Sequence, residues 1–263
     1  DAACRVIARL IKERDQARQA YSAVKGQALA TTNTAPANGA PTTSVPPAAL
    51  QAMVAKAEQL KPSRMNRSKQ KPKTLATKAD MATMKAVSSH TPHSASQPGI
   101  TCVAIHHANQ NAVATGGVDK KVKVFDRAAQ KLLGTASGHT KEITAVAWHQ
   151  TNNIIFSSSR DATVRGWSMG GSNNYEQKVN FATHKGAVND IAVQATGNYL
   201  GSCGVDGTWK LHDCVSGSTL TSVGAGEALD SIAFHPDGLL LATGSASGAF
   251  RSRYFCLSPR PRD

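Results

Sequence analysis

Cysteine is scarce in this sequence of 263 residues, and its few copies stand far apart. There is no C-x-x-C pair, and no histidine lies at ligand spacing from two cysteines. The spacing therefore predicts neither a zinc site nor a disulfide framework, and it favours a reducing compartment. We expect no metal and no cofactor. The five cysteines are Cys4, Cys102, Cys203, Cys214 and Cys256.

Long apolar runs are absent as well. No stretch approaches the roughly 18 to 20 uninterrupted apolar residues that a membrane-spanning helix needs. The sequence opens on Asp1, with neither an initiator methionine nor the apolar core of a signal peptide. We therefore expect no membrane partner, and we expect the chain to begin inside a longer protein or to have been processed.

Acidic residues are outnumbered, since 17 Asp and Glu stand against 30 Lys and Arg, for a formal net charge of +13. Spread over a folded surface, this excess would suggest an anionic partner. It lies in the flanks, however: the net charge is +3 for 1–30, +7 for 31–85 and +3 for 251–263, and residues 86–250 are neutral. The distribution argues against nonspecific binding of a phosphate backbone by the neutral region.

Residues 1–28 have the apolar spacing of a coiled-coil helix, alternating between four and three. Arg14 falls in the apolar seam, and three heptads are weak as a lone helix. The favoured interpretation is therefore oligomerisation, and the alternative is a helix docked on its own protein. The residues that would form the oligomer contact are Ile7, Leu10, Ala17, Tyr21 and Val24.

Residues 29–97 are rich in Ala, Thr, Pro and Lys and almost free of aromatic side chains. Such a segment cannot bury enough apolar surface to offset its ordering entropy, so we predict a disordered linker with one short helix near residues 48–60. It contains a basic run that is a candidate nuclear-import signal or RNA contact, and the alternative is a solvated linker that happens to be basic. The run consists of Lys61, Arg64, Arg67, Lys69, Lys71 and Lys73.

Residues 98–250 repeat with a period of about 45. The segment Ile143–His149 recurs as Val188–Gln194, an earlier copy begins at Thr101, and a later one begins at Asp230. Gly-His near the start and Trp followed by a polar residue near the end are typical of the WD repeat, which forms the four-stranded blade of a β-propeller. The sequence therefore predicts a mainly β fold with three blades and part of a fourth.

A His, a Ser, an Asp and a Trp recur together in these copies and could be mistaken for a catalytic triad. Because the set recurs once per blade, we predict a buried hydrogen-bond network with a structural role, and no catalytic residue. In blade three we expect a weaker network, because His212 replaces the Trp. The predicted members are His139, Ser157 or Ser159, Asp161 and Trp167 in blade two, His184, Ser202 and Asp206 in blade three, and Asp119 in blade one.

Residues 1–10, with Lys12-Glu13, strongly resemble the tetramerising coiled coil of the pre-mRNA-processing factor 19 family, the U-box ubiquitin ligases of the spliceosome. Residues 93–100, 138–141 and 234–239 resemble segments of that family's propeller. The resemblance implies a U-box that recruits a charged conjugating enzyme, then a coiled coil, then seven blades that bind substrates and splicing partners. This chain would then carry about three and a half of the seven blades and lack the U-box.

The sequence departs from the family pattern near its end. Ser247 stands where the blade Asp is expected, Arg253-Tyr254 stand where Trp-Asp is expected, and the basic tail 251–263 resembles nothing in the family. An incomplete ring leaves at least one strand edge and one apolar blade face uncovered. We therefore expect a chain that is poorly behaved on its own.

Two functions are consistent with these features. The favoured one is a nuclear scaffold that forms homotetramers and binds splicing-complex subunits and ubiquitination substrates, in a family that acts in splicing and DNA repair, with any ligase activity residing in the absent U-box. The alternative is an unrelated WD-repeat adaptor whose basic linker binds RNA. A stand-alone enzyme has little support, since no nucleophile with its base is found outside the repeating set.

Overall fold

The computed structural model describes residues 45–69, 81–85, 89–93, 96, 99–171 and 174–255. The chain divides into two compact units, 1–41 and 42–263, and all the described residues belong to the second. The predicted coiled-coil helix and the end of the basic tail lie outside the described residues. In the described part, no helix has the length and apolarity needed to cross a membrane.

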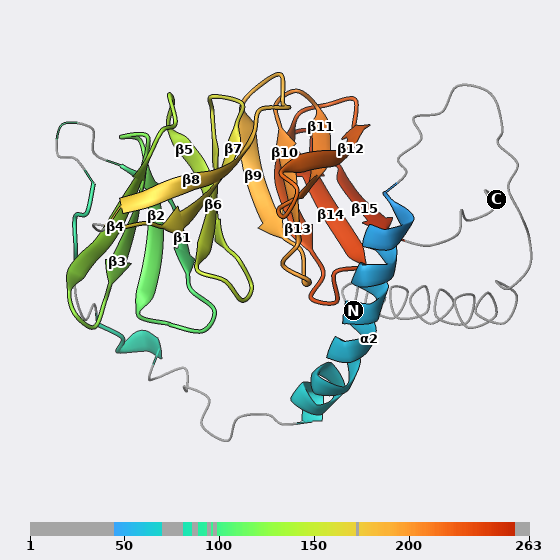
Figure 1. The fold of residues 1–263 in the computed structure, drawn as a ribbon, viewed down its shortest axis with the longest axis horizontal. Coiled ribbons are helices and arrows are strands. Elements are labelled where there is room, and N and C mark those ends of the chain that lie inside the picture. The colour runs from blue at the N-terminus through green and yellow to red at the C-terminus, as the bar shows by residue number, and fades with distance from the viewer. Residues whose placement is uncertain are drawn as a thin grey trace, which may run out of the picture. The chain divides into compact units, whose positions relative to one another are not determined.

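The described part of the chain is mainly β, and its strands form four consecutive antiparallel blades, which confirms the predicted fold class (Figure 1). Blade one contains β1 (Ile100–Ile105), β2 (Ala112–Gly117), β3 (Lys121–Asp126) and β4 (Lys131–Ser137). Blade two contains β5 (Ile143–Trp148), β6 (Ile154–Ser159), β7 (Val164–Met169) and β8 (Asn174–Phe181). Blade three contains β9 (Val188–Val193), β10 (Tyr199–Gly204), β11 (Thr208–Asp213) and β12 (Ser218–Gly224). Blade four contains β13 (Leu229–Phe234), β14 (Leu240–Ser245) and β15 (Phe250–Tyr254).

The outer strands of the first two blades are joined to each other. Strand β4 pairs in parallel with β8, where Thr135 lies opposite Asn174 and Ala136 lies opposite Tyr175. The strand order is therefore β1-β2-β3-β4-β8-β7-β6-β5, a single eight-stranded sheet, whereas blades three and four form separate sheets.

The core consists of three apolar clusters, one at each junction between consecutive blades. They form because strand residues alternate in direction, so every second side chain of a strand points at the neighbouring blade. At the first junction, Val146 and Trp148 of β5 pack on Ala114, Val122 and Val124 of blade one. Full burial of an apolar side chain of this size contributes about 1.5–3 kcal/mol, so the junctions account for much of the stability of the blades.

A helix, α2 (Pro47–Lys69), precedes the blades. It is longer than the predicted helix of residues 48–60, and one side of its first half is buried, so the prediction of a disordered linker is wrong at this stretch. Ala49 and Met53 belong to the apolar cluster that contains Trp209 and Ile232, at the junction of blades three and four. The residues Ala49, Met53 and Ala57 follow one another at intervals of four, which gives a narrow apolar stripe on one side of the helix.

Blade four extends beyond its predicted end at residue 250. Strand β15 runs to Tyr254 and pairs with β14, and the ring of Phe255 lies 6.4 Å from that of Trp209 and 6.0 Å from that of Phe234. The first residues of the predicted basic tail are therefore the third strand of a blade. Their arginines concealed the strand, because Phe250 and Ser252 alternate with charged neighbours.

Candidate functional site

In blade two the four residue types of the repeating set form one network, in which the histidine joins a serine hydroxyl to the aspartate. His139, in the loop before β5, lies with Nδ1 2.9 Å from Asp161 Oδ2 and Nε2 2.9 Å from Ser157 Oγ. Trp167 Nε1–H donates to the same hydroxyl over 2.7 Å. Ser157 Oγ therefore accepts from Trp167 and donates to His139 Nε2, and His139 Nδ1–H donates to the carboxylate. Of the two serines that the sequence offered, Ser157 is the one in contact with the histidine.

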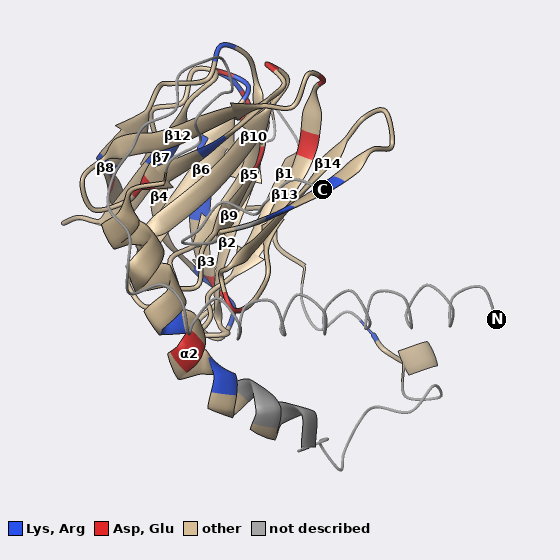
Figure 2. Ribbon diagram, turned by 90° about the vertical axis from the view of Figure 1, so that its right-hand side faces the viewer, with Lys and Arg blue, Asp and Glu red and all other residues tan. Residues whose placement is uncertain are grey.

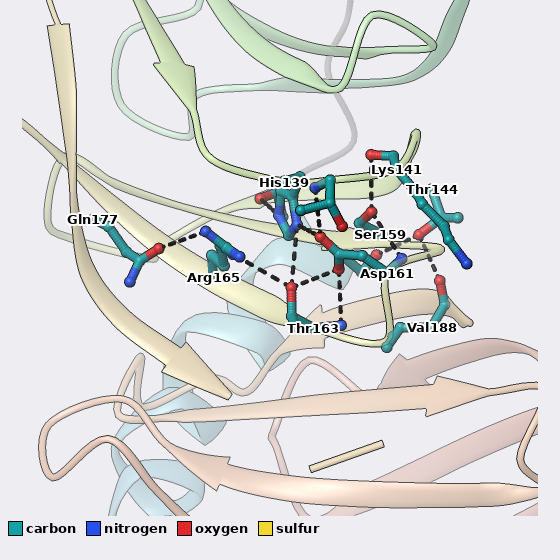
Figure 3. Close-up of polar contacts among 12 residues, drawn as sticks. His139, Lys141, Thr144, Ser159, Asp161, Thr163, Arg165, Gln177 and Val188 are labelled. Atoms are coloured by element: carbon teal, nitrogen blue, oxygen red, sulfur yellow. Dashed lines mark hydrogen bonds and ion pairs between the residues drawn. The ribbon is translucent and has the colours of Figure 1, made fainter. Parts of the chain in front are cut away.

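The carboxylate of Asp161 fastens the surrounding loop (Figure 3). It accepts hydrogen bonds from Thr163 Oγ1 at 2.6 Å and from the backbone N–H of Thr140 at 2.9 Å. Burial alone would raise the pKa of Asp161, but the hydrogen bonds from Thr163, Thr140 and His139 lower it to about 2. Burial lowers the pKa of His139, against the opposing effect of Asp161. At neutral pH the pair is thus a carboxylate and a neutral imidazole.

Ser159 lies next to this network and holds the same loop through hydrogen bonds to its backbone. Its Oγ donates to the carbonyl oxygen of Lys141 over 3.0 Å and accepts from the N–H of Asp161 over 3.1 Å. The strand β6 thus provides two hydroxyls with different partners, one for the histidine and one for the backbone.

In blade three the network is continuous, contrary to the expectation that His212 would weaken it. His184 Nδ1 lies 3.0 Å from Asp206 Oδ2, and its Nε2 lies 2.7 Å from Ser202 Oγ. His212 Nε2 lies 2.7 Å from the same hydroxyl, in the role that Trp167 has in blade two. Its Nδ1 lies 2.9 Å from Thr219 Oγ1, so the chain of hydrogen bonds reaches the outer strand β12.

The protonation of His212 follows from its surroundings. Burial, followed by the charges of His184 and Lys210, lowers its pKa to about 3. The neutral ring donates one hydrogen bond from Nε2 to Ser202 and accepts one at Nδ1 from Thr219. Ser202, with a single proton, then donates to His184 Nε2. Every polar side-chain atom in this buried series of hydrogen bonds thus has a partner, as a low-dielectric interior requires.

In blade one the structure places Asp119 beside a histidine that the repeat pattern does not assign to the network. His93 Nδ1 lies 2.8 Å from Asp119 Oδ1, and its Nε2 lies 2.9 Å from Thr115 Oγ1. His93 precedes His139 by 46 residues, close to the period of the repeat. It was missed because it stands seven residues before its strand, whereas His139 stands four before, and because a threonine replaces the serine.

Blade four has no equivalent of this network among the described residues. Ala225 and Ser247 occupy the positions of the histidine and the aspartate. In their place Arg251 pairs with Glu227 over 3.0 Å and donates to the carbonyl oxygen of Ala225 over 2.6 Å, and Ser247 donates to Glu227. The hydrogen bond from Ser247, with a smaller effect of Arg251, lowers the pKa of Glu227.

A second recurring set of hydrogen bonds links consecutive blades. These bonds form at the turn between the first two strands of each blade. His106 Nδ1 accepts from the N–H of Asn109 at 3.0 Å, and its Nε2 lies 2.9 Å from Asn153 Oδ1 of blade two. Gln194 does the same between blades three and four, since it accepts from the N–H of Thr196 and donates to the carbonyl oxygen of Gly238. In the described part of the chain, no group of three or more His, Cys, Asp or Glu could hold a metal ion.

An open cavity of about 250 Å³ lies where the inner strands of blades one, two and three begin. Arg160 Nε binds Glu142 Oε1 over 2.7 Å at its rim, and the arginine is exposed. Charged and hydrogen-bonding side chains line the cavity together with Ile143, so it offers both polar and apolar contacts. Its lining residues are Thr101, Glu142, Ile143, Thr144, Arg160 and Asn189.

The remaining predicted sites lie partly or wholly outside the described residues. Lys61 is an exposed residue of α2, and the backbone of the helix continues through residues 64–69. Figure 2 shows basic positions along α2, with an acidic one between them. Lys71, Lys73 and the predicted oligomer contact, which comprises Ile7, Leu10, Ala17, Tyr21 and Val24, are outside the described residues.

Comparison with known proteins defines the class of the chain. The profile of the family described as "WD domain, G-beta repeat" matches residues 84–126, 130–168, 175–213 and 217–251, which is more than half of the chain. The chain therefore belongs to the WD-repeat proteins.

Within that class its relatives are more specific. The profile described as "Prp19/Pso4-like" matches residues 1–24. The chain is 36% identical over 262 residues to pre-mRNA-processing factor 19 of Bos taurus and of Mus musculus, covering 93% of this chain and 51% of each relative. It is 34% identical over 271 residues to pre-mRNA-processing factor 19 homolog 2 of Arabidopsis thaliana, covering 95% of this chain and 51% of the relative. The chain is a homologue of pre-mRNA-processing factor 19, as the sequence features predicted, and it spans about half the length of the curated relatives it matches.

Proposed function

We propose that this chain is the scaffolding and partner-binding portion of a nuclear, splicing-associated ubiquitin ligase of the U-box class. The observation that carries the proposal is the presence, in one chain, of a Prp19/Pso4-like segment over 1–24 and WD repeats over 84–251. In this proposal the first segment assembles copies of the chain and the blades present loops to other proteins. In this proposal the transfer of ubiquitin is the task of a U-box domain rather than of the blades.

The buried histidine networks support a structural rather than a catalytic role for the recurring set. The side chains of His139 and Asp161 are almost completely shielded from solvent, and Ser157 is buried. The hydroxyl of Ser157 both accepts from Trp167 and donates to His139, which leaves no room for a substrate atom at the serine. A nucleophile must reach its substrate, so this arrangement favours a fixed strut.

The exposed loops are the proposed contact region for splicing-complex subunits and ubiquitination substrates. The cavity at the start of the inner strands combines groups from three blades, and the exposed Arg160 adds a charged anchor that suits the rim of a protein interface. We assign homotetramer formation to residues Ile7, Leu10, Ala17, Tyr21 and Val24.

The test is capture of splicing complexes from nuclear extract by the full chain. Wild-type protein should enrich splicing-complex proteins, Arg160→Glu should reduce their yield because it reverses the rim charge, and Val215→Glu should leave the yield unchanged. Val215 lies in an exposed turn outside the cavity. Failure of the wild-type chain to enrich any splicing-complex protein would contradict the proposal.

RNA binding by the basic run is a second candidate function. The similarity to pre-mRNA-processing factor 19 argues against an unrelated adaptor, but the charge of +7 over residues 31–85 and the exposed Lys61 on α2 favour a phosphate contact. Filter binding of the full chain to single-stranded RNA should weaken as salt rises, and the triple variant Lys61→Glu, Lys71→Glu and Lys73→Glu should flatten that dependence. The matched control is Lys121→Glu, Lys178→Glu and Lys185→Glu on the blades, and equal loss in both variants would contradict a local RNA site.

A further inference from the structure

We propose that Thr91 is a phosphorylation site, at which a proline-directed protein kinase transfers the γ-phosphoryl group of ATP to the hydroxyl, and that Lys123 then holds the phosphate. In this step Oγ1 of Thr91 attacks the γ-phosphorus, the bond from that phosphorus to the bridging oxygen breaks, ADP leaves, and the hydroxyl proton passes to the base of the kinase. The site lies just before blade one, and Thr91 takes no part in lining the cavity beside Arg160.

Thr91 has the local sequence and the backbone that such a kinase requires. The sequence holds two positions at which a hydroxyl side chain precedes a proline, Thr91-Pro92 and Ser258-Pro259, and the second lies outside the described residues. Thr91 is exposed and belongs to neither a helix nor a strand, and a proline favours an extended backbone at the residue before it. A kinase cleft takes its substrate as an extended segment, so the backbone of Thr91 is suited to it.

The residues on both sides of Thr91 are fastened to strand β3 of blade one. The ring of His90 lies 4.4 Å from that of Phe125. Lys123 Nζ donates a hydrogen bond to the carbonyl oxygen of Pro92. Thr91 therefore has a defined position beside Lys123, although the residue itself is exposed.

The stacking contact recurs within the blades. Phe181 stands three residues before His184, and its ring lies 4.4 Å from that of His212. His90 likewise stands three residues before His93, so the two stacking contacts are equivalent. The segment that carries Thr91 is therefore placed on blade one as the end of β8 is placed on blade three.

The exposure of Thr91 has its equivalents too. Thr91, Ser137 and Ala182 each stand two residues before a network histidine, and all three are exposed. Ser137 and Ala182 lie where one blade passes into the next, so this position stays open to solvent when blades stand on both sides of it. Arg165, the counterpart of Lys123 in blade two, is half-buried in the same way as Lys123.

The lysines of β3 supply the counter-charge for a phosphate. Residues 119–123 contain three lysines and one carboxylate, and Lys121 and Lys123 point to the same side of the strand because side chains alternate along it. An ammonium group has three N–H donors, and the hydrogen bond to Pro92 uses one of those of Lys123. A phosphate on Thr91 adds a charge of about −1.5 to −2 and accepts charge-assisted hydrogen bonds from the other donors.

Phosphorylation of the full chain tests the assignment. The chain is incubated with a proline-directed kinase and Mg-ATP, and mass spectrometry of its peptides locates the phosphate. We expect phosphate on Thr91, and Pro92→Ala should lower the initial rate at Thr91 by about tenfold or more relative to Ser258, which serves as the internal reference. Absence of phosphate from Thr91 in the chain, under conditions that label a synthetic peptide of residues 86–96, would overturn the proposal.

The role of Lys123 is tested on the phosphorylated chain by ³¹P nuclear magnetic resonance. A cation beside a phosphate favours its dianion, so the second pKa of the phosphate on Thr91 should be lower in the wild type than in Lys123→Met. Lys123→Arg restores the positive charge and should restore the lower value. Lys178→Met removes an exposed lysine of β8 and should keep the wild-type value. Equal values in the wild type and in Lys123→Met would refute the contact with Lys123.

Discussion

Blades two and four have the same strand plan and differ in what fastens their loops. Blade two holds its first loop through His139, Asp161, Ser157 and Trp167, all in a buried network. Blade four relies on the pair of Arg251 and Glu227, which is accessible to solvent. The strand alternation alone therefore suffices to form a blade, and the network adds rigidity to the loops.

The largest effect is expected from Asp161→Ala. The change leaves His139 Nδ1, the N–H of Thr140 and the hydroxyl of Thr163 without their acceptor in a buried setting, which should lower the free energy of unfolding by about 3 kcal/mol. Urea denaturation measures it. The matched control is Ser247→Ala in blade four, expected within about 0.5 kcal/mol of wild type. Equal losses at the two positions would contradict the comparison.

A somewhat smaller loss is expected from Ser202→Ala in blade three. Its hydroxyl is the shared partner of His184 and His212, so its removal leaves two buried imidazole nitrogens unsatisfied and should cost about 2 kcal/mol. Thr243→Val in blade four is the control, because Thr243 stands at the equivalent position and the change also deletes a hydroxyl. The same urea titration should show a smaller change for the control, and a larger one would refute a special role for Ser202.

The pH dependence of the free energy of unfolding also distinguishes blade three from blade four. The pKa of His212 is about 3 in the folded chain, and the unfolded chain titrates near pH 6.5. Below pH 6.5 the unfolded state binds a proton that the folded state does not, so stability is lost as the pH falls from 6.5 toward 3, by about 1.4 kcal/mol per pH unit for this residue. Burial lowers the pKa values of His139, His149 and His184 in the same direction.

His212→Gln isolates that contribution. Between pH 6 and 4 the variant should show a shallower loss of stability than wild type, by up to one proton, in denaturation curves measured at a series of pH values. Arg253 stands at the same position in blade four, so Arg253→Gln should leave the slope unchanged. A slope that the His212 variant shares with wild type would show that the ring is protonated in the folded state.

The smallest effect is expected from Ser247→Asp, which places the blade-two aspartate in blade four. Ala225 provides no histidine there and the new carboxylate lies near Glu227, so we expect no gain and a change within about 0.5 kcal/mol. Thermal denaturation at neutral pH measures the shift. A clear stabilisation would mean that the aspartate acts without its histidine.

The sequence predicted the blades because two signals coincide in them: the period of about 45 and the alternation of apolar residues along each strand. It predicted His139, Asp161 and Trp167 because those residue types recur at fixed spacing. It did not predict His93, since the loop that carries it is three residues longer than in blade two. The turn residues His106 and Gln194 share a role and no chemical type, so a search for identical residues passes over them.

The sequence predicted a shorter helix than α2 for a different reason. Its buried side chains are two alanines, one leucine and one methionine, and so few large apolar residues indicate burial weakly in a segment rich in alanine and proline. The packing partner, the junction of blades three and four, is distant in sequence and could not be inferred from the helix alone. The cavity beside Arg160 could not be predicted from the sequence either, because its residues come from three separate repeats.

The parallel pairing of β4 with β8 makes the blades unequal in their resistance to local opening. Hydrogen bonds at Thr135 and Ala136 tie blades one and two into a single sheet, so opening either blade requires breaking backbone bonds to the other. Blades three and four have side-chain contacts with their neighbours but belong to separate sheets. We therefore expect sub-global opening to begin from the blade-four side, and we expect the amide protons of the eight-stranded sheet to exchange last.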